Sequence, residues 1–262
     1  MPMHVRPWST VESALRASDD GIPDAENAKL HGVALKTIRR WRRDYQRRSL
    51  PRGQSHTSAR CPRCENGVLD VAAYAELLGW YLGDGHLVEA RREVLVLTIV
   101  NDQKYVEANA RLVVLMRAVK PGGRPHVRER PGAIVTAMGW KHWTCLFPQH
   151  GPGRKHDRGI VLEPWQRAVV EEEPAAFLRG LFHSDGSRVR NWASRRVPGT
   201  GEVRRHDYAR WQFSNRSEDL LELCGWALDL AGVPWRRSSR THVSVSRRAA
   251  VARLDTLIGV KR

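Results

Sequence analysis

Apolar residues recur along the chain with two periods, and turn residues separate one period from the next. Residues 94–100 form a β-rich apolar run, whereas residues 102–119 have helical spacing and end at a Pro-Gly-Gly turn. A second hairpin is predicted at 124–130 and 133–140, around Pro131 and Gly132, and a short aromatic segment follows at 141–147. After a predicted helix at 163–172 the order repeats, with strands at 187–192, 208–215, 235–239 and 241–246 and helices at 217–231 and 248–257. The pattern predicts an α+β protein with two similar halves.

Each predicted half begins with an apolar helix that has small residues four positions apart. These residues are Gly79, Gly83, Gly180 and Ser184. Small residues at this spacing allow two helix backbones to approach closely. We therefore expect the two helices to pack against each other along this row.

Both helices end in Asp-Gly, at Asp84-Gly85 and Asp185-Gly186. Glycine is a common helix stop because it takes the left-handed conformation without steric cost, so each Asp is expected in the last helical turn. The helix dipole is already negative there, and two carboxylates at adjoining helix ends repel each other unless a cation lies between them. Oxygen ligands of this kind favour Mg²⁺.

At these residues the chain resembles the LAGLIDADG homing endonucleases, in the single-chain form with two motif copies. The matching residues are Leu77, Gly79, Asp84 and Gly85 in the first copy, and Leu178, Gly180, Leu181, Asp185 and Gly186 in the second. The resemblance covers residues 71–258. The bulky Trp80 and Tyr81, and His183 before the second Asp, depart from the family pattern but leave both Asp residues in place.

The resemblance implies two pseudo-symmetric αββαββα halves that pack through the motif helices and form a β saddle on the DNA major groove. It implies catalytic, Mg²⁺-binding roles for Asp84 and Asp185, with the backbone carbonyls of Gly83 and Ser184 as weaker candidate ligands. Lys141, Lys155 and Gln212 are candidates to polarise the phosphate. We expect His183, two positions before Asp185, to pack or to support the site indirectly, and not to act as a base.

The composition points to a polyanionic partner. The chain has 262 residues and a formal net charge of +16, from 44 Lys and Arg against 28 Asp and Glu. A protein this basic usually binds nucleic acid. No apolar run approaches the roughly 20 residues needed to span a bilayer, and the N-terminus lacks a signal-peptide core. We expect a cytoplasmic, nucleoid-associated monomer that binds double-stranded DNA and is neither secreted nor held in a membrane.

Residues 1–50 predict a small helical domain that resembles a helix-turn-helix unit. Ser9 and Glu12 form a possible capping box at the start of the first helix. Ala28 is the small residue at a helix crossing, Gly32 makes the turn, and the helix at 34–47 is the expected recognition helix. Its candidate DNA-binding residues are Lys36, Arg39, Arg40 and Arg43. The alternative is a solvated basic helix in an ordinary three-helix bundle.

Residues 51–70 predict a basic linker that contains a Cys-x-x-Cys turn, Cys61 and Cys64. Two cysteines at this spacing are half of a structural Zn²⁺ site. Cys145 and His150 are candidates for the other half, and His142 and Cys224 are alternatives. The plainer interpretation is a pair of free thiols.

The remaining boundaries are a first half at 71–150, a connector at 151–170 and a second half at 171–262. Basic residues of the connector and of the second half are candidates for phosphate contacts: Arg154, Lys155, Arg188, Arg190 and Arg210. Alternation along a strand is expected to place the strand arginines on one sheet face.

Three functions fit these observations. The first is a site-specific DNA endonuclease that depends on Mg²⁺. The second is a catalytically silent transcription regulator on the same scaffold, which the N-terminal unit would suit. The third is an RNA splicing cofactor of the maturase kind.

Overall fold

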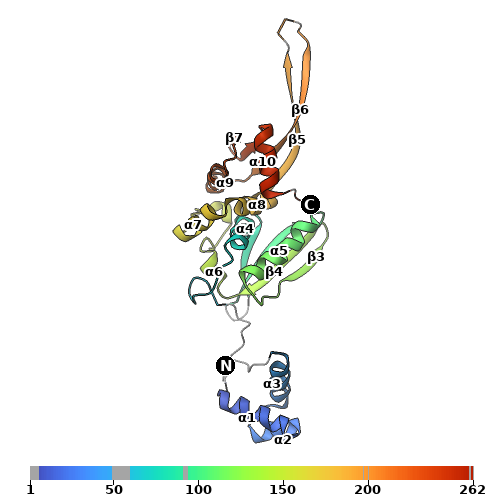
Figure 1. Ribbon diagram of the computed structural model, residues 1–262, viewed down its shortest axis with the longest axis vertical. Coiled ribbons are helices and arrows are strands. Elements are labelled where there is room, and N and C mark those ends of the chain that lie inside the picture. Colours follow the sequence, from blue (N-terminus) through green and yellow to red (C-terminus); the bar gives the residue numbers. More distant parts are fainter. Residues whose placement is uncertain are drawn as a thin grey trace. The chain divides into compact units, whose positions relative to one another are not determined.

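The computed structural model describes residues 6–48, 60–90, 94–196, 198–199, 201–259 and 261. The chain divides into two compact units, Met1–Ser58 and Ala59–Arg262 (Figure 1). The first part of the predicted linker, residues 51–59, lies outside the described residues. The rest of that segment, residues 60–70, belongs to the second unit.

The N-terminal unit contains three helices, α1 (Trp8–Asp19), α2 (Asp24–Leu30) and α3 (Leu35–Arg48). Their apolar faces bury one small cluster: Val11, Ala14, Leu15, Ala28, Ile38 and Trp41. Gly32 has a φ of 59° in the turn between α2 and α3, a conformation that favours glycine. Ala28 and Gly32 thus occupy the buried helix contact and the turn that the sequence assigned to them.

The predicted capping box at Ser9 is wrong. Helix α1 begins at Trp8 with Pro7 as the N-cap residue, and no side chain caps it. The Pro7 carbonyl accepts the first hydrogen bonds of the helix, from the amides of Thr10 and Val11. Since proline holds φ near the value that a helix start needs, the helix begins earlier and Ser9 lies inside it.

The second unit repeats one order of elements. The first half comprises α4 (Val71–Leu82), β1 (Gly85–Ala90), β2 (Val94–Asp102), α5 (Val106–Val119), β3 (His126–Arg130), β4 (Ala133–Trp140) and α6 (Trp143–Leu146). The second comprises α8 (Pro174–Asp185), β5 (Gly186–Arg196), β6 (Val203–Ser214), α9 (Glu218–Leu230), β7 (Arg236–Ser239), β8 (His242–Val245) and α10 (Arg248–Ile258). The connector holds the 3₁₀ turn η2 (Lys155–Asp157) and α7 (Pro164–Glu172).

Each half contributes one antiparallel four-stranded sheet, with strand orders β1-β2-β4-β3 and β5-β6-β8-β7. The expected α+β class and the αββαββα order are confirmed. Strands β5 and β6 are longer than predicted, and their outer part projects beyond the helices of this unit (Figure 1). Polar and basic residues fill that part, so its pattern lacked the apolar alternation that marks a strand.

Helices α4 and α8 lie side by side in the middle of the second unit (Figure 1). A Cβ added at Gly79 would lie 2.7 Å from the Leu181 amide nitrogen and 2.9 Å from the Gly180 Cα. A Cβ at Gly180 would lie 2.8 Å from the Trp80 nitrogen, and one at Gly83 would collide with the Ser184 side chain. The row of small residues therefore forms the contact between the two halves, as predicted.

A buried acidic side chain adds a polar connection across this contact. Glu76 on α4 is fully buried and pairs with Arg111 of α5 and with Arg179 of α8, whose Nη1 lies 3.1 Å from Glu76 Oε2. A buried carboxylate needs such partners because desolvation strongly disfavours an isolated charge. Arg179 thus ties the second half to the first.

Candidate functional site

The paired helix ends bring Asp84 and Asp185 to the same place, because α4 and α8 run together to their C-termini. Asp185 is the last residue of α8, whereas α4 ends at Leu82 and Asp84 lies in the turn that follows. A Cβ added at Gly83 would lie 3.1 Å from Asp185 Oδ2, so the carboxylate of the second half reaches the helix end of the first.

The predicted left-handed conformation of Gly85 and Gly186 is wrong, since neither has a positive φ. Both begin strands, and a Cβ at either would lie 2.6 Å from the Cα of the residue four positions earlier, Tyr81 or Phe182. Glycine is needed here because the chain passes directly over the last helical turn.

The two carboxylates are partly buried, and their surroundings disfavour the ionised form of each. Burial, with a further contribution from Asp185, raises the pKa of Asp84 to about 6. Burial also raises the pKa of Asp185, and a hydrogen bond from Asn215 Nδ2 to Asp185 Oδ2, at 2.7 Å, opposes that rise. A pair of carboxylates with raised pKa values is a frequent feature of functional sites.

Lys155, from the turn η2, reaches the end of α4. Its Nζ donates hydrogen bonds to the carbonyls of Gly83 at 3.0 Å and Gly85 at 2.6 Å, and also to the Tyr81 carbonyl. Tyr81 lies in the last turn of α4, where a helix leaves carbonyls without intrahelical donors, and Gly83 and Gly85 follow it. Burial lowers the pKa of Lys155 to about 8, although Asp185 and Asp84 oppose this by favouring its charge.

Lys261 occupies the corresponding place in the second half. Its Nζ donates to the Ser184 carbonyl at 3.1 Å, and the residue before the Asp in each motif copy thus accepts from a lysine. Burial lowers the pKa of Lys261, and attraction to Asp84 and Asp185 opposes that effect. The sequence prediction included Lys155 and missed Lys261. The repeat gave no direct signal for Lys261, because this lysine follows α10, 76 positions after Asp185, whereas Lys155 lies in the connector between the halves.

The oxygens at this place fit a hard divalent cation. They include both Asp carboxylates and the Gly83 and Ser184 carbonyls, and no described sulfur or imidazole group is among them. Mg²⁺ and similar ions prefer a donor set made of oxygen. The raised pKa of Asp84 adds to the fit, because a cation between the carboxylates would relieve their repulsion.

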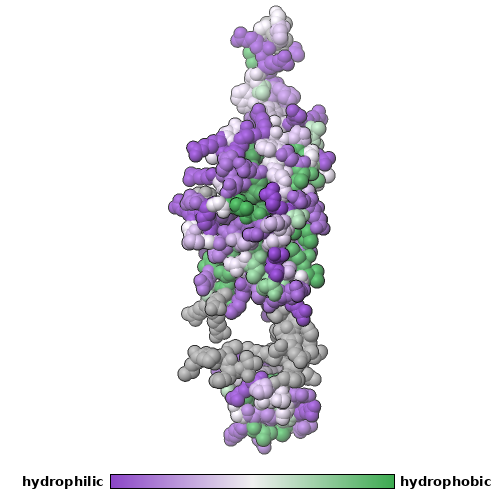
Figure 2. Space-filling model, turned by 90° about the vertical axis from the view of Figure 1, so that its left-hand side faces the viewer, coloured by the Kyte–Doolittle hydropathy of each residue, from purple (hydrophilic) through white to green (hydrophobic). Residues whose placement is uncertain are grey.

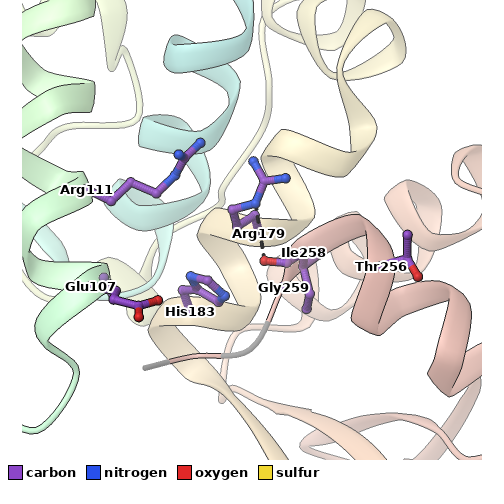
Figure 3. Close-up of a pocket in the computed structure, with 8 residues that line it drawn as sticks. Glu107, Arg111, Arg179, His183, Thr256, Ile258 and Gly259 are labelled. Carbon is purple, nitrogen blue, oxygen red and sulfur yellow. Dashed lines mark hydrogen bonds between the residues drawn. The ribbon is translucent and has the colours of Figure 1, made fainter.

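His183 lies apart from these oxygens, in a pocket between α5, α8 and the end of α10 (Figure 3). Its buried ring nitrogens have no hydrogen-bond partner within the described part of the chain, and its ring meets the edge of Trp80. Burial lowers its pKa to about 4, so the ring is neutral at pH 7. The predicted packing role agrees with this position.

Arg179 lines the same pocket and holds the end of α10 (Figure 3). It donates to the carbonyls of Leu257 at 2.8 Å and Ile258 at 3.2 Å. Lys261 follows three residues later, so Arg179 fixes the point from which the chain brings that lysine to the Asp pair.

The prediction that the strand arginines share one face is wrong. Arg188 pairs with Trp211 in the sheet, and its guanidinium makes two 2.9 Å hydrogen bonds to Asp255 of α10. Arg190 follows it on the helix-covered face, whereas Arg210 and Gln212 lie on the open face. The sequence alone does not determine which alternate positions of a strand face the helices.

The open face of the first sheet is basic as well. A hollow on it is lined by His86, Thr98, His126, Arg128 and Arg130, among others. These residues were not among the predicted DNA contacts. They alternate along the strands with Leu87, Leu97 and Met138, which face the core, and this alternation places them on the open face of the sheet. Of the other candidates, Arg154 and Lys141 are exposed.

In the N-terminal unit, Lys36, Arg39 and Arg43 are exposed on α3 and Arg40 is half-buried. Asp24 of α2 lies 3.5 Å from Arg39 and 2.6 Å from Arg42. The exposed face of α3 therefore keeps a strong excess of positive charge.

The structure groups the Cys-x-x-Cys pair with Cys145 and with the alternative His142, and the prediction of His150 as a ligand is wrong. Cys61, Cys64, Cys145 and His142 place their sulfur and nitrogen atoms within 4.8 Å of one another. His150 is not part of this group, and its amide bonds to the Phe147 carbonyl, while Cys224 is buried in the core. A hydrogen bond with Cys61 raises the pKa of the Cys64 thiol to about 12.

The surface in Figure 2 is hydrophilic over most of its area, with smaller apolar patches between. Within the described residues, no helix has the length and apolar character that a membrane span requires.

No protein-family model matches the chain, and no curated protein matches it. Solved structures are similar to it. Variants of the homing endonuclease I-DmoI have 14% identity and a TM-score of 0.45, covering 72% of this chain and 96% of theirs. I-DmoI in complex with DNA and Mn has the same identity and TM-score, and 98% of that chain is covered. A double mutant of I-SmaMI has 10% identity and a TM-score of 0.43. The similarity covers 74% of this chain and 86% of the I-SmaMI chain.

Proposed function

We propose that the chain is a site-specific double-stranded DNA endonuclease of the LAGLIDADG type that depends on a divalent cation. The observation that carries this proposal is the meeting of two corresponding helix ends. Each brings one Asp, and a lysine contacts the carbonyl just before that Asp. A duplex has two phosphodiester strands, and a site with two related sets of groups suits a cut in each.

Asp84, Asp185 and the carbonyls of Gly83 and Ser184 would hold the cation, with Mg²⁺ as the expected ion. When bound, a divalent cation lowers the pKa of a bound water and neutralises charge at the phosphate. Asn215 orients Asp185 through its 2.7 Å hydrogen bond. Lys155 and Lys261 place positive charge beside the carboxylates. Lys261 Nζ donates to one carbonyl and keeps further N–H groups for a phosphate oxygen, whereas the three N–H groups of Lys155 bind the carbonyls of Tyr81, Gly83 and Gly85. With a pKa of about 8, Lys155 can also exchange a proton near neutral pH.

Four basic surfaces support DNA as the substrate. The open faces of the two sheets carry Arg128, Arg130 and Arg210, the outer part of β5 and β6 is rich in arginine, and α3 adds a fourth helical stripe in the N-terminal unit. A net charge of +16 makes binding to phosphate strong and dependent on salt.

The decisive experiment is cleavage of a duplex DNA library with Mg²⁺ by the purified chain, beside Asp84→Asn and Asp185→Asn. We expect cuts that require Mg²⁺ and fall by more than about 100-fold in either variant, because each removes a cation ligand. The matched control is Asp255→Asn, an acid that pairs with Arg188 away from the site and should leave the chemistry intact. Cleavage unchanged in both site variants would refute the assignment.

A catalytically silent regulator is the second candidate, and one observation favours it. The Lys155 ammonium bonds to three carbonyls at the end of α4, including that of Gly83, which the cation would otherwise use. Sequence-selective binding without cuts, unaltered by Asp84→Asn or Asp185→Asn, would establish this function instead.

The N-terminal unit is proposed to bind DNA through α3. If Arg39 or Arg43 contacts phosphate, replacement by Ala should reduce the salt dependence of the binding constant by about one ion per site. The measurement is DNA affinity across a series of salt concentrations. Glu26→Gln, on α2 of the same unit, is the control for a change in charge outside α3, and an unchanged slope in both arginine variants would exclude α3 from the interface.

A further inference from the structure

We propose that Cys61, Cys64, Cys145 and His142 bind one structural Zn²⁺ that holds the start of the second unit in place. The four ligand atoms lie within 4.8 Å of one another. Three sulfurs and one imidazole nitrogen are a common donor set of structural zinc sites, which are almost always tetrahedral. This site is separate from the Asp pair, and the inference does not depend on the proposed endonuclease activity.

The imidazole of His142 is oriented for such a site. Its Nδ1 faces the sulfurs, at 3.2 Å from Cys64 Sγ and 3.9 Å from Cys145 Sγ. Its Nε2 faces the Glu65 carboxylate, with 3.6 Å between Nε2 and Oε1. Histidines that bind metals usually direct their second nitrogen to a carboxylate or a carbonyl, which fixes the tautomer. The ring of Trp140 meets the His142 ring edge-on and restricts it further.

The turn after Cys61 has the backbone form of a metal-binding knuckle. The Cys61 carbonyl accepts hydrogen bonds from the amides of Glu65 at 2.9 Å and Gly67 at 3.1 Å, and the Cys61 amide donates to Glu65 Oε2 at 2.7 Å. Asn66 has a φ of 53°, and a Cβ at Gly67 would collide with the Arg60 carbonyl. Glu65 thus supports the turn with one oxygen and faces His142 with the other.

The ion would join two segments that are far apart in the sequence. Residues 60–70 contain no helix or strand, and Val68 is 90% exposed. The other two ligands lie at and just before α6, a helix of one turn. The Leu146 carbonyl at the end of α6 accepts from the Tyr74 hydroxyl of α4 at 2.5 Å. The ligands therefore link the entry segment, α6 and the first turn of α4.

A disulfide is the competing product of this cluster. Cys64 and Cys145 have sulfurs 3.9 Å apart, and all four cysteines are free thiols. A disulfide would use two of the three sulfurs. It would not explain why the third sulfur and the His142 imidazole lie beside them. The convergence of four donors, with Glu65 behind one of them, favours the metal.

The test is metal content and metal spectroscopy of the full chain, purified without chelators under reducing conditions. We expect one Zn²⁺ per chain. Replacement by Co²⁺ should give the thiolate charge-transfer and visible bands of a tetrahedral site. Cys64→Ser and His142→Ala should lose the bound ion, and Glu65→Gln should weaken Zn²⁺ affinity by about 10- to 100-fold. Binding should release protons from the thiols, which a pH indicator detects.

The matched controls are Cys224→Ser and His150→Ala, which change the same residue types outside the cluster and should retain one Zn²⁺. Three outcomes would overturn the proposal. They are a wild-type chain with reduced thiols and no bound Zn²⁺ when the ion is supplied, Zn²⁺ retained undiminished by Cys64→Ser and His142→Ala, or a Cys64–Cys145 disulfide as the stable form. The wild-type measurement decides the matter even where a variant does not fold.

Discussion

At the end of α4 three backbone carbonyls bind the Lys155 ammonium, whereas at the end of α8 one carbonyl contacts Lys261. The acids differ in the opposite sense. Asp185 accepts a hydrogen bond from Asn215, and Asp84 accepts none from a side chain in the described part of the chain. The two motif copies share a framework, but neither the lysines nor the carboxylates are equivalent.

The internal repeat therefore specifies where the two Asp carboxylates lie, and it does not specify the hydrogen bonds and charges around each of them. Lys155 comes from the connector between the halves and is largely buried, while Lys261 comes from the last residues of the chain, after α10. The connector and the C-terminal tail are not copies of one another. We therefore expect the two strands of a DNA substrate to be cut at different rates.

The largest expected effect comes from removing the lysines one at a time. Lys155→Met should slow cleavage of one strand by about 100-fold, because the positive charge beside both carboxylates and its three contacts at the end of α4 are lost. Lys261→Met should have the smaller effect, since its Nζ has a single protein contact at the helix end. The measurement is conversion of supercoiled plasmid to nicked and linear forms. Nicked circles should accumulate with Lys155→Met, and equal effects of both variants on both strands would contradict the inequality.

The next effect is on stability, and it separates Asp84 from Asp185. The folded-state pKa of Asp84 is raised from 3.8 to about 6, so the folded protein holds that proton more tightly than the unfolded chain. The stability linked to the proton is present below pH 4 and is lost as the pH rises through about 6. Asp84→Asn avoids the loss and should stabilise the cation-free protein at pH 7 by on the order of 2 kcal/mol.

Thermal melts in EDTA at pH 7 and pH 4 measure this effect. The gain should be present at pH 7 and should shrink at pH 4, where Asp84 is protonated in the folded protein and partly protonated in the unfolded chain. Asp185→Asn is the matched comparison and should gain less, because the variant disturbs the hydrogen bond from Asn215. A destabilised Asp84→Asn at pH 7 would show that the charge of Asp84 is favourable in the folded protein.

The smallest effect tests Asn215 itself. Its hydrogen bond lowers the pKa of Asp185, so Asn215→Ala should raise that pKa. Activity should then be lost at a higher pH as the solution is acidified, with a decrease of about 10-fold near neutrality. The cleavage rate against pH is the readout. Asn191→Ala on β5 is the control, since that side chain donates to Tyr208 away from the site.

Much of the fold was predictable because its elements end at strong turn signals. Pro131 and Gly132 marked the β3–β4 turn, and Gly32 marked the α2–α3 turn with the expected positive φ. The row from Gly79 to Ser184 predicted the contact between the halves, since only small residues allow such close backbones. These features are local in sequence or repeat within it.

The site was predictable only where the repeat carried it. Asp84 and Asp185 belong to the repeat, but Lys261 reaches them because Arg179 fixes the end of α10, which is a long-range contact. His142 replaced His150 for a similar reason. Both lie near Cys145 in sequence, and the end of β4 decides which one faces the sulfurs. Arg188 faces α10 because the pairing register of β5 and β6 decides which alternate residues lie on the helix-covered face. A single sequence does not contain that register.

The long β5–β6 hairpin gives the molecule unequal reach. Strand β5 has 11 residues and β1 has 6, and at roughly 3.4 Å per residue the second half extends about 17 Å further along its strand direction. That length equals about five base pairs of B-form DNA. The cut would then lie off-centre in the stretch of duplex that the chain protects from nucleases. The second half of the protein would contact a longer half-site than the first half. The position of the cut within the protected duplex would therefore show the orientation of the protein on its target.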